Sequence, residues 1–539
     1  MNFNLVEMYN GLLRFNKHIL NELAEGLKHL PNLDGVSKGD SLIINEQGNP
    51  AWGSAAFIPT FENAAYGIEW TKDDNDIIRI GNTKFHRELP IQNRLKGCVY
   101  NEKKISYFLN PTGWAKPLEN GLIPPLDGSD GDVGVRVPEF YICVKDTGAK
   151  YQLWISDFNI DGTFTRVHPF IISHTKTMTR TREDGKEEVF SACIKHDDTR
   201  YLGGNKSSSI PAGILQGRPR TGITYDKANE FCANRGDWIT MIDYLEYCAL
   251  QALCYIEYAN FDNQAALNTN LTSDGFKQGG LGAGITNLNL ERWTVFNGNN
   301  PIVQTYWTAE HNIGNGSTNG DFYTLGNYNA DGSNFDTYPA VYRGILNFFG
   351  DIWTFIRDVA IINRNANYNS VYLLKKGVNH SDVTIDNIQD KCYFIGDQAN
   401  SNNFITEFDF RFGPYFIPNK VGTNKKADYN WIRCNNEQDT HKAVRVLLLG
   451  GTADNGSPAG SCDFHSGWVQ SDSNAHVGFF YIIPKTNKYK ININIILGSI
   501  TLPLGKSTKS KKKKKLNLKH NILWLKINLK MILLELYAI

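Results

Sequence analysis

The sequence lacks the features that mark several familiar protein classes. Its nine cysteines form no CxxC pair and are an odd number, which argues against a disulfide framework or a structural zinc site. The opening residues MNFNLVEMYN contain no basic start followed by an apolar run, and no stretch reaches the ~18 apolar residues of a spanning helix. We therefore expect a chain without a membrane span that is assembled in a reducing cytoplasm.

Catalytic signatures are missing as well. The twelve histidines form no HExxH motif, and no GxSxG sequence is present. The glycine run 280–284 lacks the spacing of a dinucleotide-binding loop. The aspartates of 126–135 miss the spacing of a calcium loop, so a solvated acidic turn explains them better than a calcium site. We expect no enzyme activity, no cofactor and no metal.

The charge is unevenly distributed along the chain. Of 56 basic and 55 acidic residues, residues 485–539 hold thirteen lysines and one glutamate, which leaves 43 basic against 54 acidic residues in 1–484. The body is therefore acidic, and nucleic acid is not an expected partner. The basic segment is either a membrane-surface or nucleic-acid tail or, as we favour, a stretch outside the fold.

Hydrophobic patterning divides the chain into four parts. An apolar stripe at steps of three and four predicts a helix over 1–31, which either forms an oligomerisation stem or docks on the next domain. Short alternating runs such as YGIEW and IIRIGN predict a small β-rich domain over 32–136. A mixed domain follows over 137–484, and the basic tail of 485–539 ends the chain. The fold class predicted is α+β.

Two helices are predicted inside the mixed domain. Thr224 can cap a helix over 225–234, and Thr240 with Asp243 can form a capping box for a second helix that ends near 259. The second helix is apolar on nearly all sides, so we expect it at the centre of a core, with Cys248 and Cys254 as small buried side chains. The polar but aromatic stretch 260–338 is typical of functional surface.

The segment 447–480, LLLGGTADNGSPAGSCDFHSGWVQSDSNAHVGFF, is the most informative part of the sequence. Apolar strands at its two ends enclose glycines, which permit tight turns, and a mixture of aromatic and hydrogen-bonding side chains, which is the composition of a binding surface. The alternative is an ordinary polar loop that joins two strands.

Several phrases resemble tail proteins of phages that infect gut Bacteroidales, among them YGIEW (66–70), LDGSDGDVGVRVPEFYI (126–142) and KQGGLGAG (277–284). The second half resembles the C-type lectin fold in its formylglycine-generating-enzyme-like branch, through the helix pair at 225–259, NFFGDIWTFIRD (347–358) and LLLGGTA (447–453). The chain departs from the enzymes of that branch because Phe480 replaces a common arginine and no cysteine pair is evident; Cys434 and Cys462 are isolated. This resemblance implies a C-type lectin-like ligand-binding domain with long insertions.

The final segment looks similar to the variable region of a diversity-generating retroelement protein, as in the major tropism determinant class of phage receptor binders. That resemblance implies a receptor-binding tail protein of the virion, with 32–136 as the tail-attachment domain and the helix over 1–31 as the stem of a trimer. The partners it implies are other tail proteins and a bacterial surface glycan or protein. The ligand-binding residues it implies are Asp463, Phe464, His465, Trp468, Gln470, Asp472, Asn474 and His476. Phe464 and Trp468 would be the anchors, and the remainder would supply hydrogen bonds. The open alternatives are a structural tail component without a ligand and an enzyme of the formylglycine-generating type.

Overall fold

A computed structural model describes the central part of the chain. The described residues are 41–44, 50–53, 58–72, 76–195, 197–206, 212–288, 293, 300–311, 313–316, 324–327, 334–337, 339–423, 427–432 and 443–484. The chain divides into two compact units, Met1–Lys485 and Thr486–Ile539. The expected helix over 1–31, the basic tail and Cys434 all lie outside the described residues.

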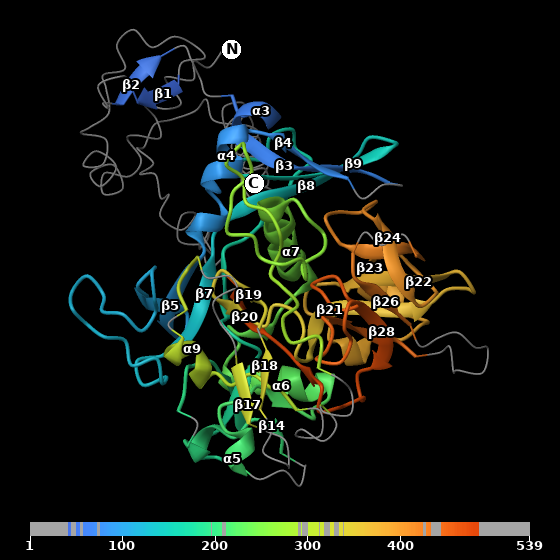
Figure 1. Ribbon diagram of the computed structural model, residues 1–539. Coiled ribbons are helices and arrows are strands. Elements are labelled where there is room, and N and C mark those ends of the chain that lie inside the picture. Colours follow the sequence, from blue (N-terminus) through green and yellow to red (C-terminus); the bar gives the residue numbers. More distant parts are fainter. Residues whose placement is uncertain are drawn as a thin grey trace, which may run out of the picture. The chain divides into compact units, whose positions relative to one another are not determined.

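The structure is mixed and rich in strands, as the α+β prediction requires in its coarser form (Figure 1). The larger helices are α6 (Tyr225–Arg235) and α7 (Tyr244–Tyr258); the shorter ones are α3 (Phe61–Ala64), α4 (Thr83–Glu88), α5 (Ala212–Leu215), α9 (Tyr306–Glu310) and α10 (Ile388–Lys391), with 3₁₀ turns η1 (Gln92–Arg94), η2 (Thr199–Tyr201) and η3 (His380–Asp382). Among the described residues, none of these helices combines the length and the apolar character that crossing a bilayer demands.

The strands form three large sheets. The five-stranded sheet has the order β10 (Thr165–Val167), β8 (Phe140–Asp146), β9 (Lys150–Ser156), β3 (Ala65–Thr71), β4 (Ile77–Gly81). The six-stranded sheet has the order β16 (Thr240–Met241), β30 (Tyr481–Pro484), β11 (Phe170–Ser173), β7 (Asp132–Val137), β5 (Lys96–Asn101), β6 (Lys104–Phe108). The nine-stranded sheet runs β23 (Cys392–Ala399), β22 (Tyr368–Leu374), β21 (Trp353–Asn363), β27 (Arg445–Leu449), β28 (Phe464–Val469), β26 (Tyr429–Trp431), β24 (Asn403–Asp409), β25 (Ile417–Gly422), with β29 (Val477–Gly478) beside β21.

Short two-stranded sheets complete the described structure. They pair β1 (Ser41–Ile44) with β2 (Pro50–Gly53), β12 (Met178–Thr181) with β13 (Glu187–Phe190), β14 (Gly204–Asn205) with β15 (Arg220–Thr221), β17 (Thr324–Asn327) with β18 (Asn334–Thr337), and β19 (Val341–Tyr342) with β20 (Ile345–Leu346). Strands from both sides of the expected boundary at 136/137 share the five-stranded and the six-stranded sheet. In the five-stranded sheet β3 pairs with β9. In the six-stranded sheet β7 pairs with β5 and with β11, and β11 pairs with β30. That boundary therefore does not separate two sheets.

Helix α6 begins and ends as the sequence predicts. The Thr224 side chain accepts a hydrogen bond from the Lys227 amide, and the helix ends at Gly236. The capping box expected at Thr240 is wrong, because Thr240 lies in β16 and α7 begins only after Asp243. The Asp243 carboxylate instead receives two hydrogen bonds of 2.6 Å from the Arg357 guanidinium.

Helix α7 lies at the centre of the main core. Thirteen of its fifteen residues are buried, and it contacts β3 and β9 of the five-stranded sheet and β21 of the nine-stranded sheet (Figure 1). The expectation of a central, all-round apolar helix is confirmed. Cys248 and Cys254 are buried on it, and all eight cysteines in the described part of the chain are buried and free.

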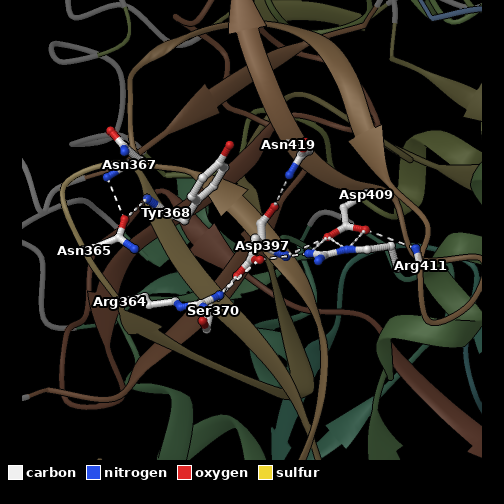
Figure 2. Close-up of polar contacts among 9 residues, drawn as sticks. All are labelled: Arg364, Asn365, Asn367, Tyr368, Ser370, Asp397, Asp409, Arg411 and Asn419. Carbon is white, nitrogen blue, oxygen red and sulfur yellow. Dashed lines mark hydrogen bonds and ion pairs between the residues drawn. The ribbon is translucent and has the colours of Figure 1, made fainter.

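The nine-stranded sheet curls so that its terminal strands β23 and β25 lie against each other. Side chains rather than a backbone ladder join β23 to β24 and β25, while β24 and β25 pair directly. Asn419 of β25 donates to the Asp397 carbonyl (3.1 Å), and the Asp397 amide donates to the Asp409 carboxylate of β24 (2.9 Å). Figure 2 shows these contacts together with Arg411, which binds both carboxylates. A curved, closed-up sheet of this kind is a stiff support for side chains on its outer face.

Candidate functional site

The segment 447–480 contains a strand that its sequence does not reveal. Strand β28 (Phe464–Val469) lies inside the stretch between the two predicted strands, and it pairs with β27 on one side and with β26 on the other. The second predicted strand over 477–483 is broken into β29 and β30, which belong to different sheets. Much of the segment is therefore framework rather than loop.

Three of the predicted ligand-binding residues are buried. Phe464 is fully buried with Leu447 and Leu449 in the core around α7. Trp468 is 9% exposed and packs with Phe355 in a second core cluster on the other side of the sheet. The expectation that Phe464 and Trp468 act as exposed anchors is wrong, because both rings lie in buried clusters. A β-bulge opposite Val446 and Leu448 breaks the alternation along β28, so the two rings face opposite sides of the sheet.

Asp463 is also placed differently from the prediction. Its carboxylate is fully buried, and a Cβ added at Gly451 would lie 2.6 Å from its Oδ2 atom. Burial, and then the nearby Asp428 carboxylate, raises the pKa of Asp463 well above its ordinary value. Asp463 therefore cannot contact a ligand outside the protein. Its carboxylate instead packs against the backbone at Gly451.

The other five predicted residues keep access to solvent. His465, Gln470, Asp472 and His476 are half-buried, and Asn474 is exposed. The His465 ring lies against Trp353, with 5.3 Å between ring centres. His476 lies between Trp293 and Trp468, at 6.0 and 5.8 Å, and its burial lowers its pKa to about 4, so the ring is neutral near pH 7.

The turn over 470–476 is held by backbone contacts from other elements. The Tyr225 amide at the start of α6 donates to the Gln470 carbonyl (3.1 Å), and the Gly222 amide donates to the Asn474 carbonyl (2.9 Å). The Trp353 amide of β21 donates to the His476 carbonyl (2.9 Å). These bonds fix the turn, so the side chains at 470, 472 and 474 are presented from a rigid backbone.

Aromatic side chains that the sequence analysis missed extend this surface. Phe404 of β24 pairs in register with Tyr429 of β26, and Trp431 of β26 pairs with His465 of β28. Phe404 and Tyr429 lie 5.2 Å apart and Tyr429 and Trp431 4.4 Å apart between ring centres, and all three rings are half-buried. We call Phe404, Tyr429, Trp431 and His465 the aromatic row. Its members come from three separate segments, so only the period-2 pattern of Tyr429-Asn430-Trp431 could have indicated it.

A cavity of about 440 Å³ adjoins the turn. It lies between α6 and the segment around η3, and its lining includes Asp226, Asn229, Arg357 and His380. The His380 ring also contacts the Gln470 amide oxygen (2.9 Å between Nδ1 and Oε1). His380 therefore connects the lining of the cavity to the turn.

Cys462 lacks the environment of a redox thiol. It is fully buried, and Gln251 and Tyr255 donate to its sulfur at 3.1 and 2.9 Å. Burial raises the pKa of the thiol well above its usual value, which disfavours the reactive thiolate. In the part of the chain that the structure describes, no group of three or more His, Cys, Asp or Glu side chains is placed to hold a metal ion.

Comparisons with known proteins return structural similarities only. No family model and no curated protein matches the chain. Among solved structures, the chain is similar to PvdO from Pseudomonas aeruginosa, with a TM-score of 0.24 and 11% identity over 66% of this chain and 95% of that one. It is also similar to the U1 variant of the Major Tropism Determinant, with a TM-score of 0.19 and 9% identity over 64% of this chain and 72% of that one, and to its I1 variant, with a TM-score of 0.20 and 10% identity over 73% and 84%.

Proposed function

We propose that the chain is a receptor-binding tail protein of a bacteriophage, which attaches the virion to a ligand on the bacterial surface. The contact surface consists of the aromatic row (Phe404, Tyr429, Trp431 and His465) and the turn over 470–476; we call it the adsorption surface. The domain that carries it is C-type lectin-like, the protein resides in the virion with other tail proteins, and copies associate as a trimer through the helix that the sequence predicts over 1–31.

The observation that carries the proposal is the contrast between a fully buried strand and a patch of half-buried side chains on its neighbours. All five residues of β27 are buried, while the neighbouring strands β28, β26 and β24 carry half-exposed rings on one face. Rigid aromatic area and nearby Gln470, Asp472 and Asn474 provide anchors together with hydrogen bonds, as in binding surfaces that use few side chains for most of their affinity. Such a patch can change its side chains without unfolding the sheet.

The proposal narrows the sequence-based hypothesis of a variable surface. Of the eight residues first implied, His465, Gln470, Asp472, Asn474 and His476 remain in the adsorption surface, and Phe404, Tyr429 and Trp431 join it. If a retroelement diversifies this region, a near-copy of the coding sequence for 445–480, differing at adenines, lies beside a reverse-transcriptase gene. Sequencing the neighbouring genome tests this point directly.

Adsorption to host cells tests the function. We expect Trp431→Ala to weaken binding of the full-length protein to host cells by roughly tenfold to a hundredfold, which corresponds to the loss of one anchor side chain. Because Trp431 is half-buried, Asn474→Arg is the second variant: this exposed position tolerates a longer side chain, and the added bulk should block the contact. Phe108→Ala, at an exposed ring in the six-stranded sheet, is the matched control.

The outcomes separate the alternatives. Unchanged adsorption by both Trp431→Ala and Asn474→Arg, with melting temperatures near that of the parent protein, would favour a structural tail component instead. The proposal assigns the chain no reaction, so Cys462→Ser in a folded protein should leave adsorption unchanged. A role of the formylglycine-generating type predicts the loss of a cysteine-dependent oxidation in that variant.

A further inference from the structure

A second surface feature lies on strands β22 and β23, and its lining shares no residue with the adsorption surface. It is a groove of about 700 Å³, within the size range of sites that hold small ligands. Its lining includes Arg364, Ser370, Tyr372, Lys375, Tyr393 and Phe394. We call this feature the cationic groove.

Aromatic rings are unusually exposed around the cationic groove. Tyr393 is 61% exposed, and Phe412, whose ring packs edge-on against Phe394 at 5.5 Å, is 55% exposed. Tyr372 contacts Phe394 in the same way at 5.6 Å. Large exposed rings that lie together cost solvation free energy, so their clustering indicates a contact surface rather than chance.

The cations of the groove are held in place by their neighbours. The Arg364 guanidinium contacts both oxygens of Asp397, at 3.2 and 3.3 Å, and Figure 2 shows that Ser370 and Arg411 bind the same carboxylate. Lys375 donates to the Asp390 carbonyl (2.8 Å), and its ammonium lies 5.2 Å from the centre of the Tyr393 ring. Two fixed positive charges therefore stand beside exposed ring faces.

The sign of the charge is opposite to that of the surrounding protein. Residues 1–484 hold more acidic than basic residues, yet the described residues that line the groove include Arg364 and Lys375 and no carboxylate. The Asp397 carboxylate balances the charge of Arg364. Lys375 contacts two backbone carbonyls and the Tyr393 ring, and no salt bridge joins it to a carboxylate of the described residues. The groove thus offers a net positive charge to an anionic ligand.

We infer that the cationic groove binds an acidic oligosaccharide, such as a uronic-acid-containing fragment of a bacterial surface polysaccharide. Sugar rings present an apolar face that stacks on Tyr393 and Phe394, hydroxyl groups that match Gln389, and carboxylates that match Arg364 and Lys375. An extended peptide fits less well, because β22 is paired with β21 and β23, and the other edge of β23 lies against β25. The inference does not rest on the adsorption surface.

An array of oligosaccharides tests the inference with the full-length protein. The array carries uronic-acid oligosaccharides, neutral oligosaccharides of matched length and short oligo-glutamate peptides. We expect binding to acidic sugars that weakens as salt is raised, and a loss of about tenfold or more in Tyr393→Ala. Lys375→Ala should lower binding to acidic sugars and leave neutral sugars unaffected.

The matched control uses a similar cation–ring pair elsewhere. Lys96 lies 5.6 Å from the centre of the exposed Phe108 ring, so Phe108→Ala and Lys96→Ala also remove an exposed aromatic ring and a lysine, and they should leave array binding unchanged. Absence of binding to every acidic sugar, preference for oligo-glutamate, or equal binding by Tyr393→Ala and the parent would overturn the inference. Trp431→Ala and Asn474→Arg should bind the array as the parent protein does. A wrong assignment of the groove can therefore be told apart from a wrong assignment of the adsorption surface.

Discussion

The buried carboxylate of Glu257 gives the most quantitative prediction. Glu257 lies on α7 and is 1% exposed. Arg343 donates to its two oxygens at 2.7 and 2.8 Å, and Lys277 donates at 2.6 Å. The three side chains join the central helix to two separate loop segments. Removing the charge of Glu257 therefore leaves Arg343 and Lys277 without their carboxylate partner and weakens the contacts around α7.

The magnitude follows from two independent arguments. Burial by itself raises the pKa of Glu257, but the charges of Arg343 and Lys277 outweigh it and lower the pKa from 4.5 to about 2. At about 1.4 kcal/mol per unit this corresponds to roughly 3 kcal/mol of stability near pH 7. Removing one partner of a buried ion pair costs about 3–5 kcal/mol by comparison with other proteins. We therefore expect Glu257→Gln to lower the free energy of unfolding by about 3–5 kcal/mol.

The pH dependence has a definite sign. Because the folded-state pKa is lowered, the contribution of Glu257 is fully present above about pH 4.5 and is lost as the pH falls through about 2. Urea unfolding of parent and variant across this range measures the difference. Glu88→Gln, in the exposed Lys84–Glu88 pair with 3.7 Å between Nζ and Oε1, is the control and should change stability by less than about 0.5 kcal/mol. A loss below about 1 kcal/mol in Glu257→Gln at pH 7 would refute the reasoning.

Three further measurements test other parts of the structure. Gly460→Ala places a Cβ 2.0 Å from the Asp428 carboxylate, so it should lower the melting temperature by several degrees. Gly316→Ala is the control and should not lower it, because a Cβ there would have no atom within 4 Å. Equal melting temperatures of the two variants would contradict the close packing at Gly460. Burial lowers the pKa of His476 from 6.5 to about 4. The stability that its neutral ring provides is therefore complete above about pH 6.5 and is lost as the pH falls through about 4. An NMR titration midpoint above about 6 would contradict this burial. Asp397→Ala removes the carboxylate that binds Arg364, Ser370 and Arg411. Amide hydrogen exchange should therefore become faster in β23 and β24 and stay slow in α6. Equal changes in the strands and in α6 would argue against the joining of the sheet ends by side chains.

Where local sequence controls structure, the predictions hold. Helix α6 has its capping threonine and terminal glycine in adjacent sequence, and α7 reads as buried because nearly every position is apolar. The strands around YGIEW and the apolar run of 445–449 were likewise visible from period and composition. In each case the decisive residues lie within a few positions of one another.

Long-range pairing decided what the sequence could not. The composition of 463–476 predicts a polar surface, but β26 and β27 enclose β28 and turn Phe464 and Trp468 inward. Asp243 has the spacing of a capping residue, but Arg357, more than a hundred positions away, binds its carboxylate. A side chain's burial depends on which strand lies beside it, and that neighbour is not encoded in adjacent residues.

By itself, then, the sequence determined that the described body is a strand-rich protein with a central apolar helix, an acidic charge balance and a C-terminal segment rich in rings and hydrogen-bonding groups. Only the tertiary structure decided which of those groups face solvent, that Phe404, Tyr429 and Trp431 line up with His465, and that Arg364 and Lys375 share a groove with exposed aromatic rings. The physical reason is that helix formation and capping are settled within a few residues, whereas the two faces of a sheet are settled by partners far away in the chain.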